Sequence, residues 1–266
     1  HLQDWRGSPF RVDRPFEFSD QPIFVGREIE TRELITRLEA NVDRGRGLLL
    51  VTGPSGVGKS SLIRAGLLPR LARPFQFPGI ALCRWCLVDL AAGEEPLQAL
   101  ATAVSAPTIL GASLQRFGLD TQALAALLVA TPEVAATELA AALAQVSVKF
   151  AEQAGTNGGR AQLVIVVDPL DDLFGPSATR GGLGPGEDMP VVASGEATPP
   201  TGLGVPLAPA ARAFLAALSC LAARDGIWVI ATLRSDFLPL LAGLPELAAE
   251  LDEVSWFPLQ PPATAR

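Results

Sequence analysis

One stretch of the sequence combines residue types that can bind a phosphate group. Residues 53–60 read Gly-Pro-Ser-Gly-Val-Gly-Lys-Ser, which is the G-x-x-x-x-G-K-S spacing of a phosphate-binding loop. Its glycines permit backbone angles closed to bulkier residues, so successive N–H groups can converge on phosphate oxygens. Lys59 can neutralise the β- and γ-phosphates, and the Ser60 hydroxyl can bind Mg²⁺. The pattern predicts a nucleotide site formed by Gly53, Pro54, Ser55, Gly56, Val57, Gly58, Lys59, Ser60 and Ser61.

The segments on either side of this loop have the order that a phosphate site needs. Residues 48–52 form an apolar run typical of a buried strand, and residues 62–68 are amphipathic, as in a helix. The phosphates would then lie at the positive end of the helix dipole. The structural alternative is a flexible glycine turn before an ordinary helix. The complete motif between a strand and a helix favours nucleotide binding.

Three acidic residues follow a second buried run. Residues 162–167 are unbroken by charge and rich in β-branched side chains, which is typical of a strand covered on both faces. Asp168 ends this run and supplies the carboxylate that a Mg²⁺-nucleotide site needs. Asp171 and Asp172 are candidates for positioning an attacking water. The alternative is a solvated turn at the strand end, with Asp171 capping a helix.

A basic residue stands at the end of the next predicted strand. Residues 226–233 form that strand, and Arg234 follows it. Its guanidinium could lie near a γ-phosphate. The alternative is a surface ion pair with Asp236.

Strands and helices alternate along the chain. Strands are expected at residues 48–52, 80–90, 162–168, 226–233 and 254–259. Helices are expected at residues 27–41, 62–68, 208–223 and 246–251, and in an Ala/Leu-rich region of about 91–154 with breaks near Pro107, Gly111, Gly118 and Thr131. This alternation indicates an α/β fold with a parallel sheet, whose ligands lie beyond the carboxyl ends of the strands. We therefore expect residues 53–60, 168–172 and 234–236 to share one cleft.

Composition bounds the function. The 266 residues are 48% apolar and 18% charged, as in a core-rich globular chain, and the net charge of −7 disfavours a broad nucleic-acid surface. No uninterrupted apolar run reaches membrane-span length, so we expect no membrane span. Residues 175–206 are rich in Gly, Pro and Ser, so we expect a mobile insertion there. The chain begins at His1, which suggests a piece of a longer polypeptide.

The cysteines indicate a reducing, cytoplasmic compartment. There are three, and an odd, small number argues against a disulfide framework. Cys83 and Cys86 have CxxC spacing, but His1 is the only histidine, so a four-ligand zinc site has too few donors. We interpret these residues as core thiols of a strand.

The motifs together resemble the NTPase domain of the STAND class, signal-transduction ATPases with numerous domains, and most closely the bacterial novel STAND branch. The segments that carry the resemblance are Arg14-Pro15-Phe16, residues 24–28 (Phe-Val-Gly-Arg-Glu), residues 53–69, Pro96-Leu97, residues 167–168 and 171–174, and residues 232–237 (Thr-Leu-Arg-Ser-Asp-Phe). The extension of the phosphate loop through Pro69 and the Leu-Arg-Ser-Asp-Phe segment are the specific parts. The resemblance covers most of the chain outside the helical region and residues 175–206.

The resemblance implies a three-layer P-loop NTPase fold, similar to ASCE and AAA+ ATPases, with strand order 5-1-4-3-2. Residues 1–26 would contribute to the adenine site and residues 27–266 would form the core, with Val25, Gly26 and Arg27 against adenine. Lys59, Ser60 and Asp168 would serve phosphate and Mg²⁺ as Walker A and B residues, and Arg234 would sense the γ-phosphate. ADP would favour a closed form and ATP an oligomerising one. Winged-helix, sensor and effector domains would lie outside this chain.

Two departures from the family pattern bear on turnover. Relatives commonly carry a Glu pair where Asp171 and Asp172 stand, and Pro169 occupies the position of an acid in many related ATPases. We therefore expect a slow ATPase. Neither Asn41 nor Asn157 begins an Asn-Lys-x-Asp segment, so the sequence disfavours GTP. The leading prediction is a regulatory ATPase switch. The alternatives are a nucleotide-holding scaffold without hydrolysis and an ATPase acting on DNA.

Overall fold

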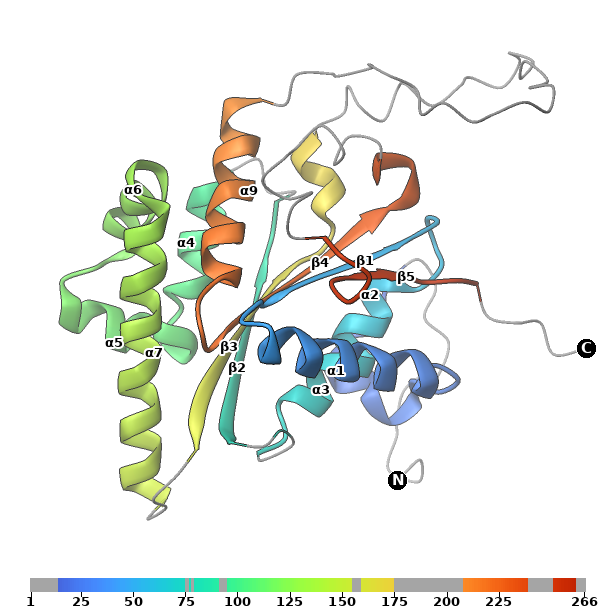
Figure 1. The fold of residues 1–266 in the computed structure, drawn as a ribbon, viewed down its shortest axis with the longest axis horizontal. Coiled ribbons are helices and arrows are strands. Elements are labelled where there is room, and N and C mark those ends of the chain that lie inside the picture. Colours follow the sequence, from blue (N-terminus) through green and yellow to red (C-terminus); the bar gives the residue numbers. More distant parts are fainter. Residues whose placement is uncertain are drawn as a thin grey trace, which may run out of the picture.

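A five-stranded parallel sheet forms the centre of the molecule (Figure 1). The computed structural model describes residues 14–74, 77, 79–90, 95–154, 159–174, 208–238 and 251–261. The strands are β1 (Leu48–Gly53), β2 (Ile80–Val88), β3 (Arg160–Val167), β4 (Ile227–Arg234) and β5 (Trp256–Pro258). Their order is β2-β3-β4-β1-β5. This confirms the expected fold class and the expected strand order.

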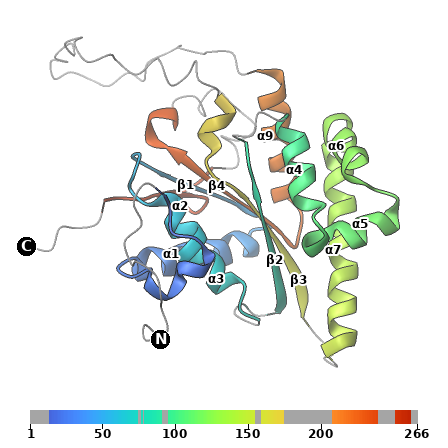
Figure 2. The same ribbon diagram turned by 180° about the vertical axis from the view of Figure 1, so that it is seen from behind.

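Helices cover both faces of the sheet. One face is covered by α1 (Glu28–Asp43) and by the helical run α2 (Lys59–Ser61), η3 (Leu62–Leu67) and α3 (Leu68–Leu71). The other is covered by α4 (Pro96–Val104), η4 (Pro107–Gly111), α5 (Ala112–Leu114), η5 (Gln115–Phe117), α6 (Thr121–Ala130), α7 (Pro132–Ala154) and α9 (Pro209–Ala222). Short 3-10 turns are η2 (Phe18–Ile23), η6 (Leu170–Phe174) and η7 (Ser235–Phe237). The two helix groups lie on opposite sides of the sheet in both views (Figures 1 and 2).

The central strand β3 shows why the sheet is buried on both faces. Successive side chains of a strand point to opposite sides. Leu163, Ile165 and Val167 enter the core below α7 and α9. Val164 and Val166 enter the core below the helical run α2-η3-α3, called here the phosphate-loop helix. All five are fully buried, which explains why this strand reads as a continuous apolar run.

The helix after the phosphate loop contains a π-helical turn. The π segment η3 lies between α2 and α3, and Pro69 occupies the second position of α3. Proline has no N–H to donate, and its ring excludes the carbonyl four residues earlier. The wider π turn occurs where an uninterrupted α-helical ladder would meet this proline. The helix expected from residue 62 is therefore present, but with altered geometry.

Cys83 and Cys86 lie on opposite faces of β2. Cys86 belongs to the core under α4, whereas Cys83 packs against the core under α1. Both are free thiols, and burial raises the pKa of each to about 12. Among the described residues there is no cluster of three or more His, Cys, Asp or Glu that could hold a metal by itself. The two residues are core thiols, as expected.

One described helix, α7, is long and apolar enough by itself to cross a membrane over Pro132–Gln153. Its Ala135, Leu139 and Leu143 are buried in the core against the sheet. Lys149 and Glu152 are not buried. An amphipathic helix of this kind is typical of a core cover. The buried side of α7 therefore packs on the sheet, and its other side carries polar residues that are not buried.

Some expected boundaries were wrong. The strand expected at 80–90 ends at Val88, and the one expected at 254–259 is only Trp256–Pro258. The backbone N–H groups of Val254 and Ser255 both donate to the Asp252 carboxylate, forming a turn instead of a strand start. The insertion expected at 175–206 and nearly all of the helix expected at 246–251 lie outside the described residues.

Candidate functional site

The parallel pairing brings three polar strand ends to one edge of the sheet. Gly53 at the end of β1 is in register with Arg234 at the end of β4. Val167 at the end of β3 is in register with Ala231 of β4, and Asp168 follows it. The phosphate loop, the acidic turn and the arginine are thus neighbours, although 50 or more residues separate them in sequence. Figure 1 shows β1, β3 and β4 ending on the same side.

The phosphate loop has the backbone conformation that its glycines allow. Gly56 and Gly58 have φ angles of +75° and +96°, which residues with a Cβ rarely adopt. Gly53 is needed for a different reason: a Cβ there would lie 2.7 Å from the carbonyl oxygen of Leu259. The loop therefore packs directly against the chain that follows β5.

Lys59 lies against its own loop. Its ammonium donates to the carbonyl oxygens of Gly53 and Pro54, both at 2.9 Å. Burial lowers the pKa of Lys59, and this shift is opposed by the negative charges of Asp171 and Asp168. The lysine is thus close enough to both acids for electrostatic coupling.

The Asp168 carboxylate is completely buried and receives hydrogen bonds at both oxygens. Oδ1 accepts from the hydroxyls of Ser60, at 2.8 Å, and Thr232. Oδ2 accepts from Nε of Arg64 at 2.8 Å. Neither Thr232 nor Arg64 was predicted to belong to the site. The available signals were a polar residue in the buried strand β4 and an arginine one helical turn after Ser60.

Asp171 and Asp172 differ in their surroundings. Asp171 is half-buried, and its carboxylate accepts from the backbone N–H of Arg234 at 2.8 Å, which links η6 to the end of β4. Burial raises the pKa of Asp171. Asp172 is exposed overall. Its pKa is raised because part of the carboxyl group is shielded from solvent and because Asp171, Asp89 and Asp168 are negatively charged.

Arg234 forms the ion pair with Asp236 that was the structural alternative to a nucleotide role. Its guanidinium also lies 5.4 Å from the centre of the Phe237 ring. Its Nε is buried without a hydrogen-bond partner among the described residues. Arg234 and Asp236 nevertheless act electrostatically on Lys59, so both belong to the same cluster.

Of the three residues expected to contact adenine, Val25, Gly26 and Arg27, the arginine already forms hydrogen bonds within the protein. Val25 is 70% exposed, and Gly26 has a φ of +84°. Arg27 is 9% exposed and donates to the carbonyl oxygens of Val57, at 3.0 Å, and Gln260, at 3.1 Å. The Arg27 side chain therefore links α1 to the phosphate loop and to the chain after β5. Its contact with a base stays a prediction.

Ser61 connects the N-terminal segment, residues 14–24, to the phosphate-loop helix, which is the run of α2, η3 and α3. The Ser61 hydroxyl accepts from the backbone N–H of Phe16 at 3.1 Å. The rings of Phe16 and Phe24 are 5.7 Å apart. A phosphate contact by the Ser61 side chain therefore competes with an existing hydrogen bond.

The oxygen atoms and the phosphate-binding groups of this site are of the kinds that bind a Mg²⁺-nucleotide. Mg²⁺ prefers oxygen ligands, and Ser60 Oγ and Asp168 Oδ1 lie side by side. Two protein oxygens are too few for a complete Mg²⁺ shell, so phosphate and water oxygens would supply the rest. The positive φ angles of the glycines and the adjacent Lys59 suit those phosphates.

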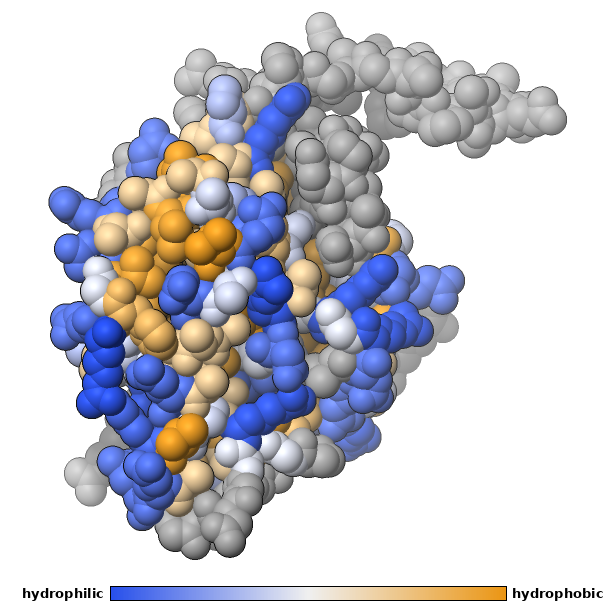
Figure 3. Space-filling model, turned by 60° about the vertical axis from the view of Figure 1, so that its left-hand side comes forward, coloured by the Kyte–Doolittle hydropathy of each residue, from blue (hydrophilic) through white to orange (hydrophobic). Residues whose placement is uncertain are grey.

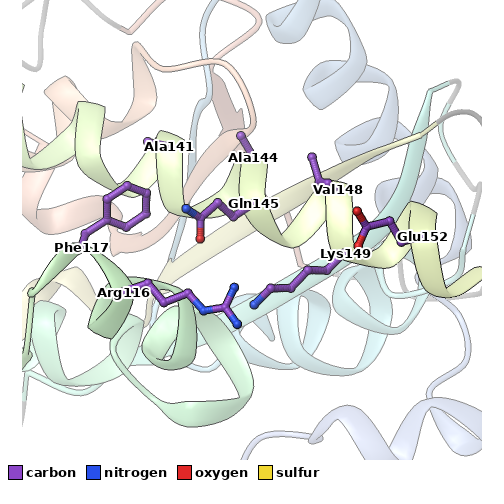
Figure 4. A pocket seen from close by; sticks show the side chains of 8 residues that line it. All are labelled: Arg116, Phe117, Ala141, Ala144, Gln145, Val148, Lys149 and Glu152. Carbon is purple, nitrogen blue, oxygen red and sulfur yellow. The ribbon is translucent and has the colours of Figure 1, made fainter.

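Two cavities lie in the helical region, which was expected to provide packing and not a site. One, of about 510 Å³, lies between η5 and α7, where Arg116 and Lys149 point toward each other near Gln145 (Figure 4). The other, of about 640 Å³, is lined by Leu97, Val129 and other residues of α4, α6 and α9. The face turned forward in Figure 3 shows apolar side chains gathered among charged ones. Neither cavity is lined by residues of the phosphate loop.

Comparison with known proteins identifies the family. The family model described as Novel STAND NTPase 1 matches residues 9–266. No curated protein matches. Among solved structures, the ORC1 protein of Aeropyrum pernix, in complex with DNA, is similar with 18% identity and a TM-score of 0.50. The match covers 91% of this chain but 47% of the ORC1 chain, and at this identity it shows the fold alone.

The fold and the family agree on a nucleotide-binding NTPase. The ORC1 likeness supports a P-loop α/β fold, and the observed sheet order is the one expected for it. Because the family model matches nearly the whole sequence, this chain belongs to the Novel STAND NTPase 1 family.

Proposed function

We propose that this chain is the ATP-binding, Mg²⁺-dependent regulatory ATPase module of a multidomain, cytoplasmic bacterial STAND protein acting in signalling or defence. In this proposal the bound nucleotide controls oligomerisation and the output of fused sensor and effector domains. The observation that supports it best is the convergence of the phosphate loop, Ser60 and Asp168 at the carboxyl edge of the sheet. In open α/β sheets, ligands bind at that edge.

The side chains of the loop have defined tasks in this proposal. Lys59 leaves the carbonyl oxygens of Gly53 and Pro54 and binds the β- and γ-phosphates. The backbone N–H groups from Gly56 to Ser60 hold the phosphate oxygens. Ser60 and Asp168 hold Mg²⁺, which when bound would neutralise phosphate charge. Val25, Gly26 and Arg27 contribute to the adenine site.

Asp172 is the better candidate for orienting the attacking water. Asp171 already accepts the Arg234 N–H, whereas Asp172 accepts no hydrogen bond from the described residues and is exposed. Partial burial and the neighbouring acids raise the pKa of Asp172, which makes it a stronger proton acceptor. With ATP bound, the Arg234 guanidinium would leave Asp236 and pair with the γ-phosphate. ADP has no γ-phosphate, so only ATP would draw Arg234 into the site.

The binding test uses the two lysines of the chain. Lys59→Ala should abolish binding of ATP with Mg²⁺ in isothermal titration calorimetry, because the phosphate charge loses its counter-charge in the loop. Lys149→Ala on α7 is the matched control and should bind ATP like the unaltered chain. Unchanged ATP affinity in Lys59→Ala would refute the proposal. The nucleotide released on denaturing the purified protein should be ADP or ATP, not a guanine nucleotide.

A nucleotide-holding scaffold without turnover is the second candidate. It is favoured by the arrangement of the catalytic candidates: Asp171 is bound to the backbone of β4, and Arg234 is paired with Asp236. Phosphate release measured over hours separates the two functions. Release that disappears in Lys59→Ala would eliminate the scaffold, whereas tight ATP binding without release would favour it.

An ATPase that acts on DNA is the third candidate, since the structurally similar ORC1 protein was solved in complex with DNA. The net charge of −7 argues against a DNA-binding surface. We therefore expect duplex DNA to leave the rate of phosphate release unchanged. DNA-stimulated release would favour this candidate.

A further inference from the structure

Arg64 lies between the Asp168 carboxylate and the N-terminal segment. Its Nε donates to Asp168 Oδ2 at 2.8 Å, and its Nη1 donates to Oε1 of Glu17, also at 2.8 Å. A third donor, Nη2, reaches the backbone oxygen of Asp168 at 3.3 Å. The Arg64 side chain is 20% exposed, compared with 0% for Asp168 and 49% for Glu17. One guanidinium is thus shared by a buried acid and a half-exposed one.

The buried carboxylate depends on this guanidinium for its charge balance. Ser60 and Thr232 donate neutral hydroxyl hydrogens to Asp168, and Lys59 is directed to the loop carbonyls. Among the residues that the structure describes, Arg64 is therefore the cation in direct contact with Asp168. A buried charge that loses its partner is strongly destabilising. Arginine stays protonated in proteins, so the guanidinium supplies a permanent positive charge here.

The same guanidinium would compete with a cation in the nucleotide site. A second positive charge at Asp168 is repelled by Arg64 unless the guanidinium moves away. Glu17 offers an alternative anionic partner at the same distance as Asp168.

We propose that Arg64 is a positioning residue that balances the charge of Asp168 while no metal is bound, and that Glu17 holds the guanidinium when Asp168 serves Mg²⁺. This inference rests on the proposed function. It assigns to Arg64 the coupling between metal binding and the N-terminal segment, residues 14–24.

That segment is packed tightly enough to respond to a movement of Arg64. A Cβ at Gly66 on the loop helix would lie 3.0 Å from the Phe24 ring, so the helix and the segment are in close contact. Glu17 is the N-cap residue of the 3-10 turn η2, and the backbone N–H of Phe16 donates to the Ser61 hydroxyl. A shift of the guanidinium toward Glu17 therefore changes contacts of the N-terminal segment.

The test compares ADP affinity with and without metal. Calorimetry gives the dissociation constant of ADP in EDTA and in saturating Mg²⁺, and the ratio of the two constants measures the benefit of the metal. Arg64→Gln should raise this ratio at least about fivefold, since the competing charge is gone. Glu17→Gln should lower it about two- to fivefold, since Arg64 then stays on Asp168. Arg73→Gln, an exposed arginine just after α3, is the matched control and should leave the ratio unchanged.

Two further variants separate charge from folding. Arg64→Lys keeps the charge and should stay near the ratio of the unaltered chain. In the Arg64→Gln background, Glu17→Gln should no longer change the ratio, because the coupling passes through Arg64. Glu17 is half-exposed, so its variant tests the inference even where Arg64→Gln fails to fold.

The outcomes have separate meanings. If Arg64→Gln and Glu17→Gln weaken ADP equally in both buffers, Arg64 is a structural residue only and the inference is wrong, while the proposed function stands. A ratio that falls in Arg64→Gln would also overturn it. If the unaltered chain binds no ADP in either buffer, the proposed function fails and the inference fails with it.

Discussion

Asp171 and Asp172 show how one residue of displacement changes the chemistry that a carboxylate can do. The Asp171 side chain is half-buried and accepts the Arg234 N–H, so it holds two strand ends together. The Asp172 side chain is exposed at the same turn. Its pKa is raised first by partial burial and then by the negative charges of three neighbouring acids. A carboxylate in that position suits proton acceptance.

Asp172→Asn should therefore keep ATP affinity and lower the rate of phosphate release at least about tenfold, because the amide cannot accept a proton. The pH profile provides a second measurement. Asp172 must be deprotonated to work, so the rate should fall as pH drops through its raised pKa, at a higher pH than for an ordinary Asp. This acid limb should be absent from the residual rate of Asp172→Asn. Asp43→Asn, at the exposed end of α1, is the control; equal losses in both variants would contradict the assignment.

At the scale of elements, the site depends on contacts between segments that are distant in sequence. Arg27 at the start of α1 donates to the carbonyl oxygens of Val57 in the phosphate loop and Gln260 after β5. Gly53 packs against Leu259 of the same segment. The Trp256 indole of β5 donates to the Thr52 hydroxyl at 2.8 Å, one residue before the loop. The loop is thus fixed from several sides.

Arg27→Ala should destabilise the domain by about 2–3 kcal/mol, because it removes charged donors from two carbonyl groups and a buried partner from Glu30. The measurement is the free energy of unfolding from urea denaturation. Arg32→Ala, an exposed arginine on the same helix, should cost less than about 0.5 kcal/mol. Equal stability of the two variants would show that Arg27 does not link these segments.

Features set by residues within one segment could be predicted from the sequence, whereas contacts between distant segments could not. The strand β3 was predictable because burial on both faces leaves a continuous apolar run. The helix breaks near Pro107, Gly118 and Thr131-Pro132 were predictable because proline and glycine act locally, whereas no break occurs at Gly111, where η4 continues into α5. The strand order came from the family resemblance. The contacts of Arg64 and Thr232 with Asp168 were missed because they depend on tertiary packing, which spacing within one segment does not reveal.

At the scale of the molecule, the N-terminal segment, the loop helix and the sheet edge surround one set of charged groups. Lys59, Arg64 and Arg234 face Asp168, Asp171 and Asp236 within this set. A ligand bound there would lie between the phosphate loop, the turn that follows β3 and the end of β4. Binding should therefore stabilise the whole fold and not one segment.

ADP with Mg²⁺ should raise the thermal unfolding midpoint of the chain. A ligand at 100 times its dissociation constant adds about 2.7 kcal/mol to the free energy of unfolding. Adding EDTA should remove most of the increase, and Lys59→Ala should show none of it. An equal increase with Mg²⁺ alone would place the stabilising ion outside the phosphate site.

The two thiols of β2 offer a view of how the sheet opens. Cys83 and Cys86 lie on opposite faces of β2, an edge strand, and Cys83 is partly exposed whereas Cys86 is buried. Alkylation of Cys83 therefore needs no rearrangement of the sheet. Alkylation of Cys86 would instead record movement of β2 or of the layer that contains α4, on the face opposite the phosphate-loop helix.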